Sequence, residues 1–382
     1  MKVIPYARQL IDRSDLNAVA KALKSDWLTQ GPAVRDFEDK LCQYSGAKYA
    51  VCLANGTAAL HIAMMALGVS RGDKTLTSPV TFSASANCAV YVGAKPGFID
   101  IDCRSYHMDI DRLKSFLKAP SRRNRIKAVV PVHFMGTVSD IVEIRDICSR
   151  YGIKVVEDAA HALGAKYKYK GSWIKVGSCK HSDVTILSFH PIKHITTGEG
   201  GAILTNDKKI YEKALSFRHH GIIRSNAKPA WFYDISELGF NYRITDFQCA
   251  LGVSQLKKLN KMVKRRRRLV KNYNRYFAQI PQIQLPFERP DTYASYHLYV
   301  VRLKKNKRNQ LYDYLRKNNI LTQVNYIPVH LLSFYRNNFG YKRGDFPEAE
   351  KYFKECLSLP LYPGLSCGDQ LRVINQVKKF FK

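Results

Sequence analysis

Short apolar runs alternate with amphipathic stretches from about residue 35 to residue 230. Ser139 to Tyr151 is predicted to be a helix with Ser139 as its N-cap, and the runs rich in β-branched residues are predicted to be strands. This alternation predicts an α/β domain with a largely parallel sheet, which carries its ligands at the carboxyl ends of the strands. The predicted strands include Lys74–Ser78, Ile126–His133, Lys154–Asp158, Asp183–Phe189 and Gly201–Thr205.

The remaining chain has a different pattern. A long and mostly helical stretch from Arg243 to about Gln279 connects to a proline-rich loop, after which short elements resume. We therefore predict a large α/β domain over residues 1–240, a linking helical region over 241–280 and a smaller C-terminal α/β domain over 281–382. The elements expected in the smaller domain are a strand over Tyr296–Leu303 and helices over Lys307–Asn318 and Pro347–Cys356.

Composition narrows the class of protein. At 382 residues and 46% hydrophobic, the chain has ample apolar surface for two packed units. No window approaches the ~20 apolar residues of a transmembrane helix, and the N-terminus has no apolar signal region, so we expect no membrane span. The nine cysteines are scattered without a CxxC pair, which favours reduced thiols in the cytoplasm, and we predict no metal site.

The charge balance is unusual, because 62 Lys and Arg against 31 Asp and Glu give a net charge of +31. Such a charge is typical of proteins that bind a nucleic acid, an anionic membrane surface or a polyanionic substrate. It is equally explained by a generally lysine-rich composition. The cations are spread evenly along the chain, which favours a generally lysine-rich composition over an anionic partner. The one dense run, Lys264–Arg268, is predicted to be the solvated face of a helix, and no aromatics are interleaved with it, so we expect no nucleic acid partner.

Candidate chemistry gathers at predicted strand ends. Asp158 ends one strand, and Lys193 follows another in a glycine-rich loop five residues after Ser188. Alone, each has an ordinary explanation: a strand-end aspartate often caps a helix, and a loop lysine is usually solvated. Pyridoxal phosphate (PLP), however, needs a lysine amine, an acid for its pyridine nitrogen and donors for its phosphate.

The other requirements of PLP also have candidates. Gly56 and Thr57 open an apolar helix whose N-terminal N–H groups suit a phosphate, although they equally suit an ordinary cap. Phe82 follows a predicted strand and is an aromatic that suits the pyridine ring, although core packing explains it as well. The joint order of these residues along the chain, ending in Ser188 and Lys193, favours a PLP site.

This pattern resembles the DegT/DnrJ/StrS-type sugar aminotransferases, a branch of the aspartate-aminotransferase fold (PLP fold type I). The resemblance extends over essentially the whole chain, and the segment from Ser188 to Gly201 is its most specific part. Within the family, the sequence is most similar to the aminotransferases of pseudaminic acid biosynthesis. The other matching segments are Leu28–Pro32, Asn55–Thr57, Glu157–Gly164, Gly239–Arg243 and Gln323–His330.

The resemblance implies a role for each matched residue. Lys193 matches the Schiff-base lysine and Asp158 the partner of the pyridinium nitrogen, so both are expected to be catalytic. Asn241 matches a phosphate ligand that comes from a neighbouring subunit, which implies a homodimer with shared active sites. The remaining matches to the cofactor site are His161 beside the cofactor, Ser188, Gly56 and Thr57 at the phosphate, and Phe82 at the ring.

The resemblance also implies a reaction. The family members most similar in sequence transfer an amino group from glutamate to C4 of a UDP-4-keto-6-deoxy-N-acetylhexosamine. A different nucleotide-linked 3- or 4-keto sugar remains an alternative, because Ser225–Tyr233 has no clear match in the family; a non-catalytic anion-binding or regulatory protein is the other alternative. The expected substrate contacts are Tyr6, Leu28, Thr29, Gln30, Asn325 and Tyr326.

Overall fold

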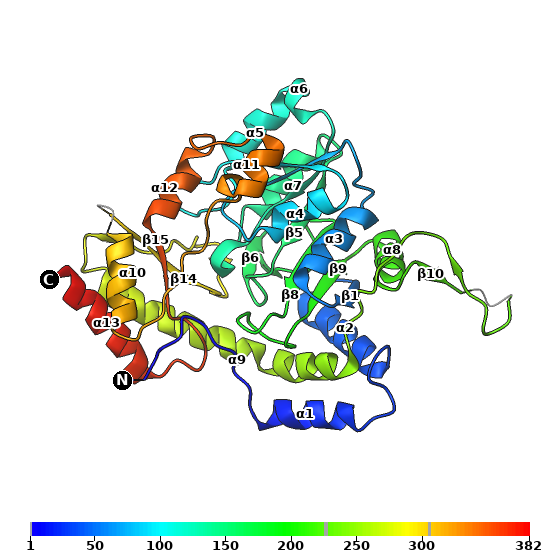
Figure 1. Cartoon of the computed structure of the whole chain (residues 1–382), viewed down its shortest axis with the longest axis horizontal. Helices are drawn as coiled ribbons and strands as arrows, with labels where there is room; N and C mark the ends of the chain where they lie inside the picture. The colour runs from blue at the N-terminus through cyan, green and yellow to red at the C-terminus, as the bar shows by residue number, and fades with distance from the viewer. Residues whose placement is uncertain (1, 225–227, 305–306) are drawn as a thin grey trace.

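A computed structural model describes residues 2–224, 228–304 and 307–382. Within these residues, a seven-stranded sheet of order β1-β9-β8-β5-β4-β2-β3 lies at the centre of the molecule (Figure 1). Strands β8, β5, β4, β2 and β3 run parallel, and β9 is antiparallel to both β1 and β8. The strands are β1 (Tyr49–Leu53), β2 (Lys74–Thr77), β3 (Lys95–Phe98), β4 (Ile126–Val130), β5 (Lys154–Asp158), β8 (Val184–Ser188) and β9 (Gly201–Thr205).

Both faces of this sheet are buried under helices, which explains why its strands are apolar runs rather than alternating patterns. Val155 belongs to the core on one face, and its neighbour Val156 belongs to the core on the other. The first core is completed by α2 (Pro32–Ser45), α5 (Ile110–Lys118), α7 (Ile141–Ser149) and α9 (Asp246–Phe277). The second is completed by α3 (Gly56–Ala66), α4 (Ala84–Tyr91) and α8 (Lys208–Arg218).

The C-terminal residues build a separate core around an antiparallel sheet of order β12-β14-β15. Its strands are β12 (Ile283–Gln284), β14 (Tyr299–Leu303) and β15 (Cys356–Leu359). The accompanying helices are α10 (Arg308–Lys317), α11 (Ser333–Phe339), α12 (Pro347–Glu355) and α13 (Cys367–Phe381), with the short turns η1 (Phe134–Gly136) and η2 (Val329–Leu331) elsewhere in the described residues.

Smaller elements surround these two cores. Helix α1 (Arg13–Leu23) packs along α9, and α6 (Pro120–Arg123) follows α5. Strand β13 (Thr292–Tyr293) pairs with β6 (Lys166–Tyr169), which pairs with β7 (Ser172–Lys175). The hairpin of β10 (Ile222–Ile223) and β11 (Asp234–Ile235) projects away from the rest of the molecule beyond α8 (Figure 1). Of the segment Ser225–Tyr233, residues 225–227 lie outside the described residues.

The predicted α/β class with a largely parallel sheet is confirmed, with corrections at element ends. Ser139 was wrong as an N-cap, since α7 begins at Ile141 and the Ser139 N–H donates to Nδ1 of His133 over 3.1 Å. The strand expected from Tyr296 begins at Tyr299, because Tyr296 has φ 51° and the His297 N–H donates to the carbonyl of Met135.

The long helix α9 joins the two cores. Its first half contributes Leu256 and Leu259 to the core of the large sheet, whereas its second half contributes Tyr273 and Phe277 to the C-terminal core. The predicted domain limits at residues 240 and 280 stay predictions. None of the helices in the described ranges is both long and apolar enough to cross a membrane.

The basic run in α9 is only partly a solvated face, so this prediction was wrong for its centre. Arg266 is fully buried and donates to the carbonyls of Tyr296, His297 and Leu361. Arg267 forms an ion pair with Glu288 over 2.6 Å. At 3.6 residues per turn, five consecutive residues span more than one full turn, so some of them must face the core.

Candidate active site

A cavity of about 960 Å³ opens at the carboxyl ends of β5 and β8, beside the start of α3. This is where a doubly wound sheet is expected to bind its ligand. Residues from the C-terminal part of the chain also line it, among them Gln323. The predicted site residues in the lining are Tyr6, Gly56, Thr57, Phe82, Asp158, His161, Ser188, Lys193, Asn325 and Tyr326.

Lys193 lies in the loop that follows β8, where its N–H donates to the carbonyl of His190 over 2.9 Å. Desolvation of its amine lowers the pKa of Lys193 to about 8, although the nearby charge of Asp158 opposes this shift. Burial disfavours the ammonium form, so the amine is partly neutral near physiological pH. Such an amine is a nucleophile and a proton acceptor, unlike a solvated surface lysine.

Asp158 ends β5, and its buried carboxylate faces the cavity. Its Oδ2 accepts a hydrogen bond from Ser85 Oγ over 2.6 Å, and its Oδ1 accepts one from the Ala160 N–H over 3.1 Å. The main chain of Asp158 is also held, because its N–H donates to the carbonyl of Pro131 and its own carbonyl accepts from His133. The carboxylate is therefore fixed through both its side chain and its backbone.

A buried network supports the segment that holds Asp158. His133 Nδ1 accepts from the Ser139 N–H, so its Nε2 carries the proton and donates to Glu157 over 2.7 Å. Burial alone would raise the pKa of Glu157, but the hydrogen bonds from His133 and from two hydroxyls outweigh it and lower that pKa. This hydrogen bond connects the segment after β4 to the residue before Asp158.

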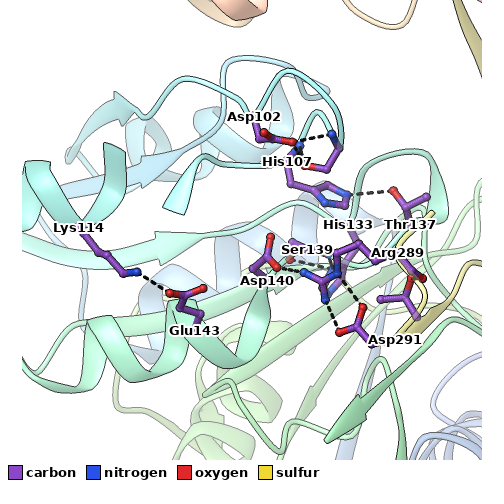
Figure 2. A network of polar contacts seen from close by, with 12 residues as sticks. Asp102, His107, Lys114, His133, Thr137, Ser139, Asp140, Glu143, Arg289 and Asp291 are labelled. Carbon is purple, nitrogen blue, oxygen red and sulfur yellow. Dashed lines mark hydrogen bonds and ion pairs between the residues drawn. The ribbon is translucent and has the colours of Figure 1, made fainter. Parts of the chain in front are cut away.

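The loop that follows His133 is tied down as well (Figure 2). Thr137 lies within hydrogen-bond distance of His107 Nε2, at 3.0 Å, and Arg289 forms ion pairs with Asp140 and Asp291. These contacts come from segments far apart in the sequence, and they fix the turn between β4 and α7.

The start of α3 provides an anion site in the same cavity as the carboxylate of Asp158. The N-cap Asn55 accepts from the Ala58 N–H over 2.8 Å, while the first N–H groups of a helix have no intrahelical partner. Gly56 lies so close to Ser188 that a Cβ on Gly56 would be 3.1 Å from the Ser188 Cβ. The hydroxyls of Thr57 and Ser188 and the helix N-terminus form a set of donors that fits a phosphate.

His161 lines the cavity next to Tyr326, whose hydroxyl is 3.3 Å from His161 Nε2. Burial lowers the pKa of His161 well below its ordinary value, with further contributions from Lys193 and His194, so the imidazole is neutral. The ring of Phe82 is exposed and lies 6.1 Å from that of Tyr326. The two rings add apolar surface for a flat ligand to the cavity that Asp158 and the start of α3 also line.

The residues present therefore fit PLP. The cavity brings together an amine, a carboxylate, an anion site and aromatic rings, which are the groups that this cofactor requires. Lys193 would hold it covalently, Asp158 would pair with its ring nitrogen, and Ser188 and Thr57 would bind its phosphate.

Four predicted residues do not line this cavity. Leu28, Thr29 and Gln30 are exposed in the segment before α2, where Thr29 forms a bridge with Thr245. Asn241 is exposed and forms a bridge with His219 at the base of the β10–β11 hairpin. Their roles stay predictions.

Sequence reasoning missed several residues of the site. Ser85 looks like part of an ordinary helix start, and no local signal connects it to Asp158, which lies 73 positions later. His297 is buried with neither ring nitrogen hydrogen-bonded in the described residues, and its ring lies 4.3 Å from that of His161. His161 follows β5 and His297 precedes β14, so only the tertiary structure brings these two histidines together.

Comparison with known proteins adds family information to this geometry. Residues 9–378 match the DegT/DnrJ/EryC1/StrS aminotransferase family. The chain is 38% identical to the UDP-4-amino-4,6-dideoxy-N-acetyl-beta-L-altrosamine transaminase of Campylobacter jejuni, covering 99% of this chain and 99% of the relative.

Solved structures give a similar result. The fold is similar to Helicobacter pylori PseC, an aminotransferase of pseudoaminic acid biosynthesis, with a TM-score of 0.90, 29% identity, and coverage of 100% of this chain and 99% of PseC. It is also similar to the PLP form of the sugar aminotransferase Spr1654 from Streptococcus pneumoniae, with a TM-score of 0.89, 29% identity and coverage of 99% and 98%.

Proposed function

Because the chain belongs to the DegT/DnrJ/EryC1/StrS aminotransferase family, whose members are PLP-dependent sugar aminotransferases, we propose that it transfers an amino group from glutamate to C4 of a UDP-4-keto-6-deoxy-N-acetylhexosamine. The main support for this proposal is that the desolvated amine of Lys193 shares one cavity with Asp158 and with a helix start suited to binding an anion. The 38% identity to an altrosamine transaminase supports the choice of sugar.

When bound, PLP supplies an electrophilic carbon that takes up amines and a protonated ring that withdraws electrons from them. The chain supplies the proton chemistry. With its pKa lowered to about 8, the Lys193 amine can accept a proton from the α-carbon of the donor. It can later deliver a proton to the sugar carbon that receives the amino group. Asp158, as a fixed anion, favours the charged ring nitrogen.

The sugar contacts belong to this proposal too. Tyr6, Asn325 and Tyr326 line the cavity, so we assign them to the nucleotide sugar. Tyr326 lies beside His161 in the cavity lining, and it offers a hydroxyl for the sugar and a ring for packing.

A second copy of the chain completes the proposed site. We assign Leu28, Thr29, Gln30 and Asn241 to sites shared within a homodimer, since none of them lines the cavity of its own chain. The exposed apolar side chains near the β10–β11 hairpin support such an interface, because Trp231 is 77% and Leu238 80% exposed. All nine cysteines are described and unpaired, which supports a reducing compartment such as the cytoplasm.

The cofactor part of the proposal is tested by trapping. The purified protein should be yellow, and borohydride should bleach it while fixing PLP to Lys193, as peptide mass spectrometry would report. Lys193→Ala should stay colourless, whereas Lys342→Ala, which changes an exposed loop lysine, should remain yellow. A wild-type protein that never holds PLP and instead binds nucleic acid would favour the non-catalytic alternative.

The sugar part is tested with a panel of UDP-, dTDP- and GDP-linked 3- and 4-keto sugars. With ¹⁵N-glutamate as donor, we expect the label at C4 of the UDP-linked N-acetylhexosamine, located by NMR of the product. Labelling of a dTDP sugar, or of C3, would favour the alternative of a different nucleotide sugar.

A further inference from the structure

The carboxylate of Asp158 is held by a hydroxyl pair that does not itself belong to the predicted cofactor contacts. Ser85 is fully buried in the first turn of α4, and its Oγ donates to Asp158 Oδ2 over 2.6 Å. Thr81 Oγ1 lies 2.7 Å from the same Ser85 Oγ. Thr81 lines the cavity, so the pair extends from the cavity wall to the carboxylate.

The direction of these hydrogen bonds follows from the number of protons. A hydroxyl has one proton to donate, and an ionised carboxylate can only accept. Ser85 therefore gives its proton to Asp158, and Thr81 gives its own proton to the oxygen of Ser85. The order Thr81 to Ser85 to Asp158 stabilises the negative charge at its end, and each donor strengthens the next.

Ser85 has little freedom to move. Its N–H donates to the carbonyl of Phe82 over 3.2 Å, and its own carbonyl accepts from the Cys88 thiol over 3.2 Å. The turn that carries Ser85 therefore also carries Phe82, the exposed ring on the cavity wall. Any shift of Ser85 would move the carboxylate contact and this ring together.

The two oxygens of Asp158 divide their roles through these contacts. Oδ1 accepts from the Ala160 N–H and Oδ2 from Ser85, so the plane of the carboxylate is set by donors on both sides. A carboxylate that lost one donor could rotate about its side chain, and a buried charge with fewer donors is costly. The orientation of the carboxylate is thus controlled by a residue from another element.

We propose that Ser85 is a positioning residue for the cofactor, which aims the Asp158 carboxylate at the pyridine nitrogen, and that Thr81 fixes the direction in which Ser85 donates. The inference rests on the PLP dependence of the family and not on the identity of the sugar. Ser85 reaches the cofactor only through Asp158, so its loss weakens the hold on the ring nitrogen and leaves the Lys193 amine in place.

The test measures the cofactor rather than turnover alone. Removing a hydrogen bond to a charged group typically costs a factor of roughly ten to a hundred in affinity, so Ser85→Ala should raise the Kd of PLP for the apo protein by that factor. In ¹⁵N NMR of bound labelled PLP, the ring nitrogen should lose its proton at lower pH than in the wild type. Thr81→Val should show the same changes to a smaller extent, because Ser85 keeps its proton.

Two variants serve as controls. Ser83→Ala changes a neighbouring serine that makes no side-chain cap at the start of α4, so it should leave the Kd and the ring-nitrogen titration unchanged. Ser85→Cys keeps a weak donor of similar size, so it should retain part of the wild-type affinity for PLP. It replaces Ser85→Ala as the test variant if Ser85→Ala folds poorly. Thermal unfolding of each apo variant reports whether it folds.

Crystal structures of the apo variants provide a further readout, because Asp158 should rotate in Ser85→Ala and keep its orientation in Ser83→Ala. A folded Ser85→Ala protein that binds PLP with wild-type affinity and holds the ring proton to the same pH would overturn the proposal. Failure on the sugar panel, by contrast, would change only the substrate and not these measurements.

Discussion

Lys193 is an amine whose ionisation is set by burial. Desolvation lowers its pKa to about 8, whereas Asp158 acts in the opposite direction. The neutral fraction of the amine therefore rises through the pH range in which most lysines are still protonated. This burial makes the residue reactive, but it cannot be recognised in the sequence, because the residues that bury the amine are not all its neighbours along the chain.

This shift predicts the pH dependence of cofactor capture by the apo protein. Only the neutral amine adds to PLP, so the rate should rise about fivefold from pH 7 to pH 8 and level off above pH 9. Absorbance stopped-flow would follow it. Asp158→Asn removes the charge that raises the pKa, so the midpoint should move below 8. A wild-type midpoint near that of a solvated lysine would contradict the desolvated environment of the amine.

Three buried histidines, His161, His194 and His297, behave differently from Lys193. Burial lowers the pKa of each well below its ordinary value. They therefore stay neutral as the pH falls from 8 to 6, and Lys193 is the group among these four that titrates near neutral pH.

At the scale of elements, α9 shows how a single charged run divides its roles. Exposed cations such as Lys264 and Arg268 face solvent, whereas Arg266 is buried and joins the helix to the loop before β14 and to Leu361. Burial lowers the pKa of Arg266 to about 10, so it still carries its charge at neutral pH. Its guanidinium replaces water for three carbonyl groups.

We expect Arg266→Met to destabilise the apo protein by about 2–4 kcal/mol, because three buried carbonyls lose their donor. The matched variant Arg268→Met changes an exposed cation two residues further along α9, and it should change stability by less than about 0.5 kcal/mol. Urea unfolding followed by circular dichroism measures both. Equal midpoints for the two variants would mean that Arg266 contributes no more than a surface cation.

At the scale of the whole molecule, the proposed shared sites predict complementation. Lys193→Ala should inactivate the site in its own chain, and Asn241→Ala should inactivate the site of the partner subunit. Mixed and reassembled in equal amounts, two inactive variants should regain roughly a quarter of wild-type activity, because half of the dimers then contain one intact site. No recovery, with dimers present by sedimentation, would mean that each site takes Lys193 and Asn241 from the same chain.

The exposed apolar side chains near the β10–β11 hairpin give this prediction a structural control. Leu238→Asp introduces a charge where the side chain is 80% exposed in the single chain, so it should not affect folding. Sedimentation should nevertheless report a shift toward monomer, if a second copy covers this residue.

Much of the fold was predictable from the sequence, because strands and helices follow from local patterns. The apolar runs at β5, β8 and β9 were placed to within a residue or two, and the order of Asp158, Ser188 and Lys193 along the chain indicated a PLP site. The predicted strand to His133 ends at Val130 instead. Element ends were also misplaced at Ser139 and Tyr296, where contacts with other segments decide the local conformation.

The sequence by itself determined the class of fold and proposed candidate residues for the cofactor, because periodicity and motifs are properties of neighbouring positions. Only the tertiary structure decided that Ser85 holds Asp158, that His133 pairs with Glu157, and that Arg266 is buried. These contacts join positions that lie tens of residues apart. They arise when the packing of the sheet and helices excludes water and forces each buried polar group to find a partner.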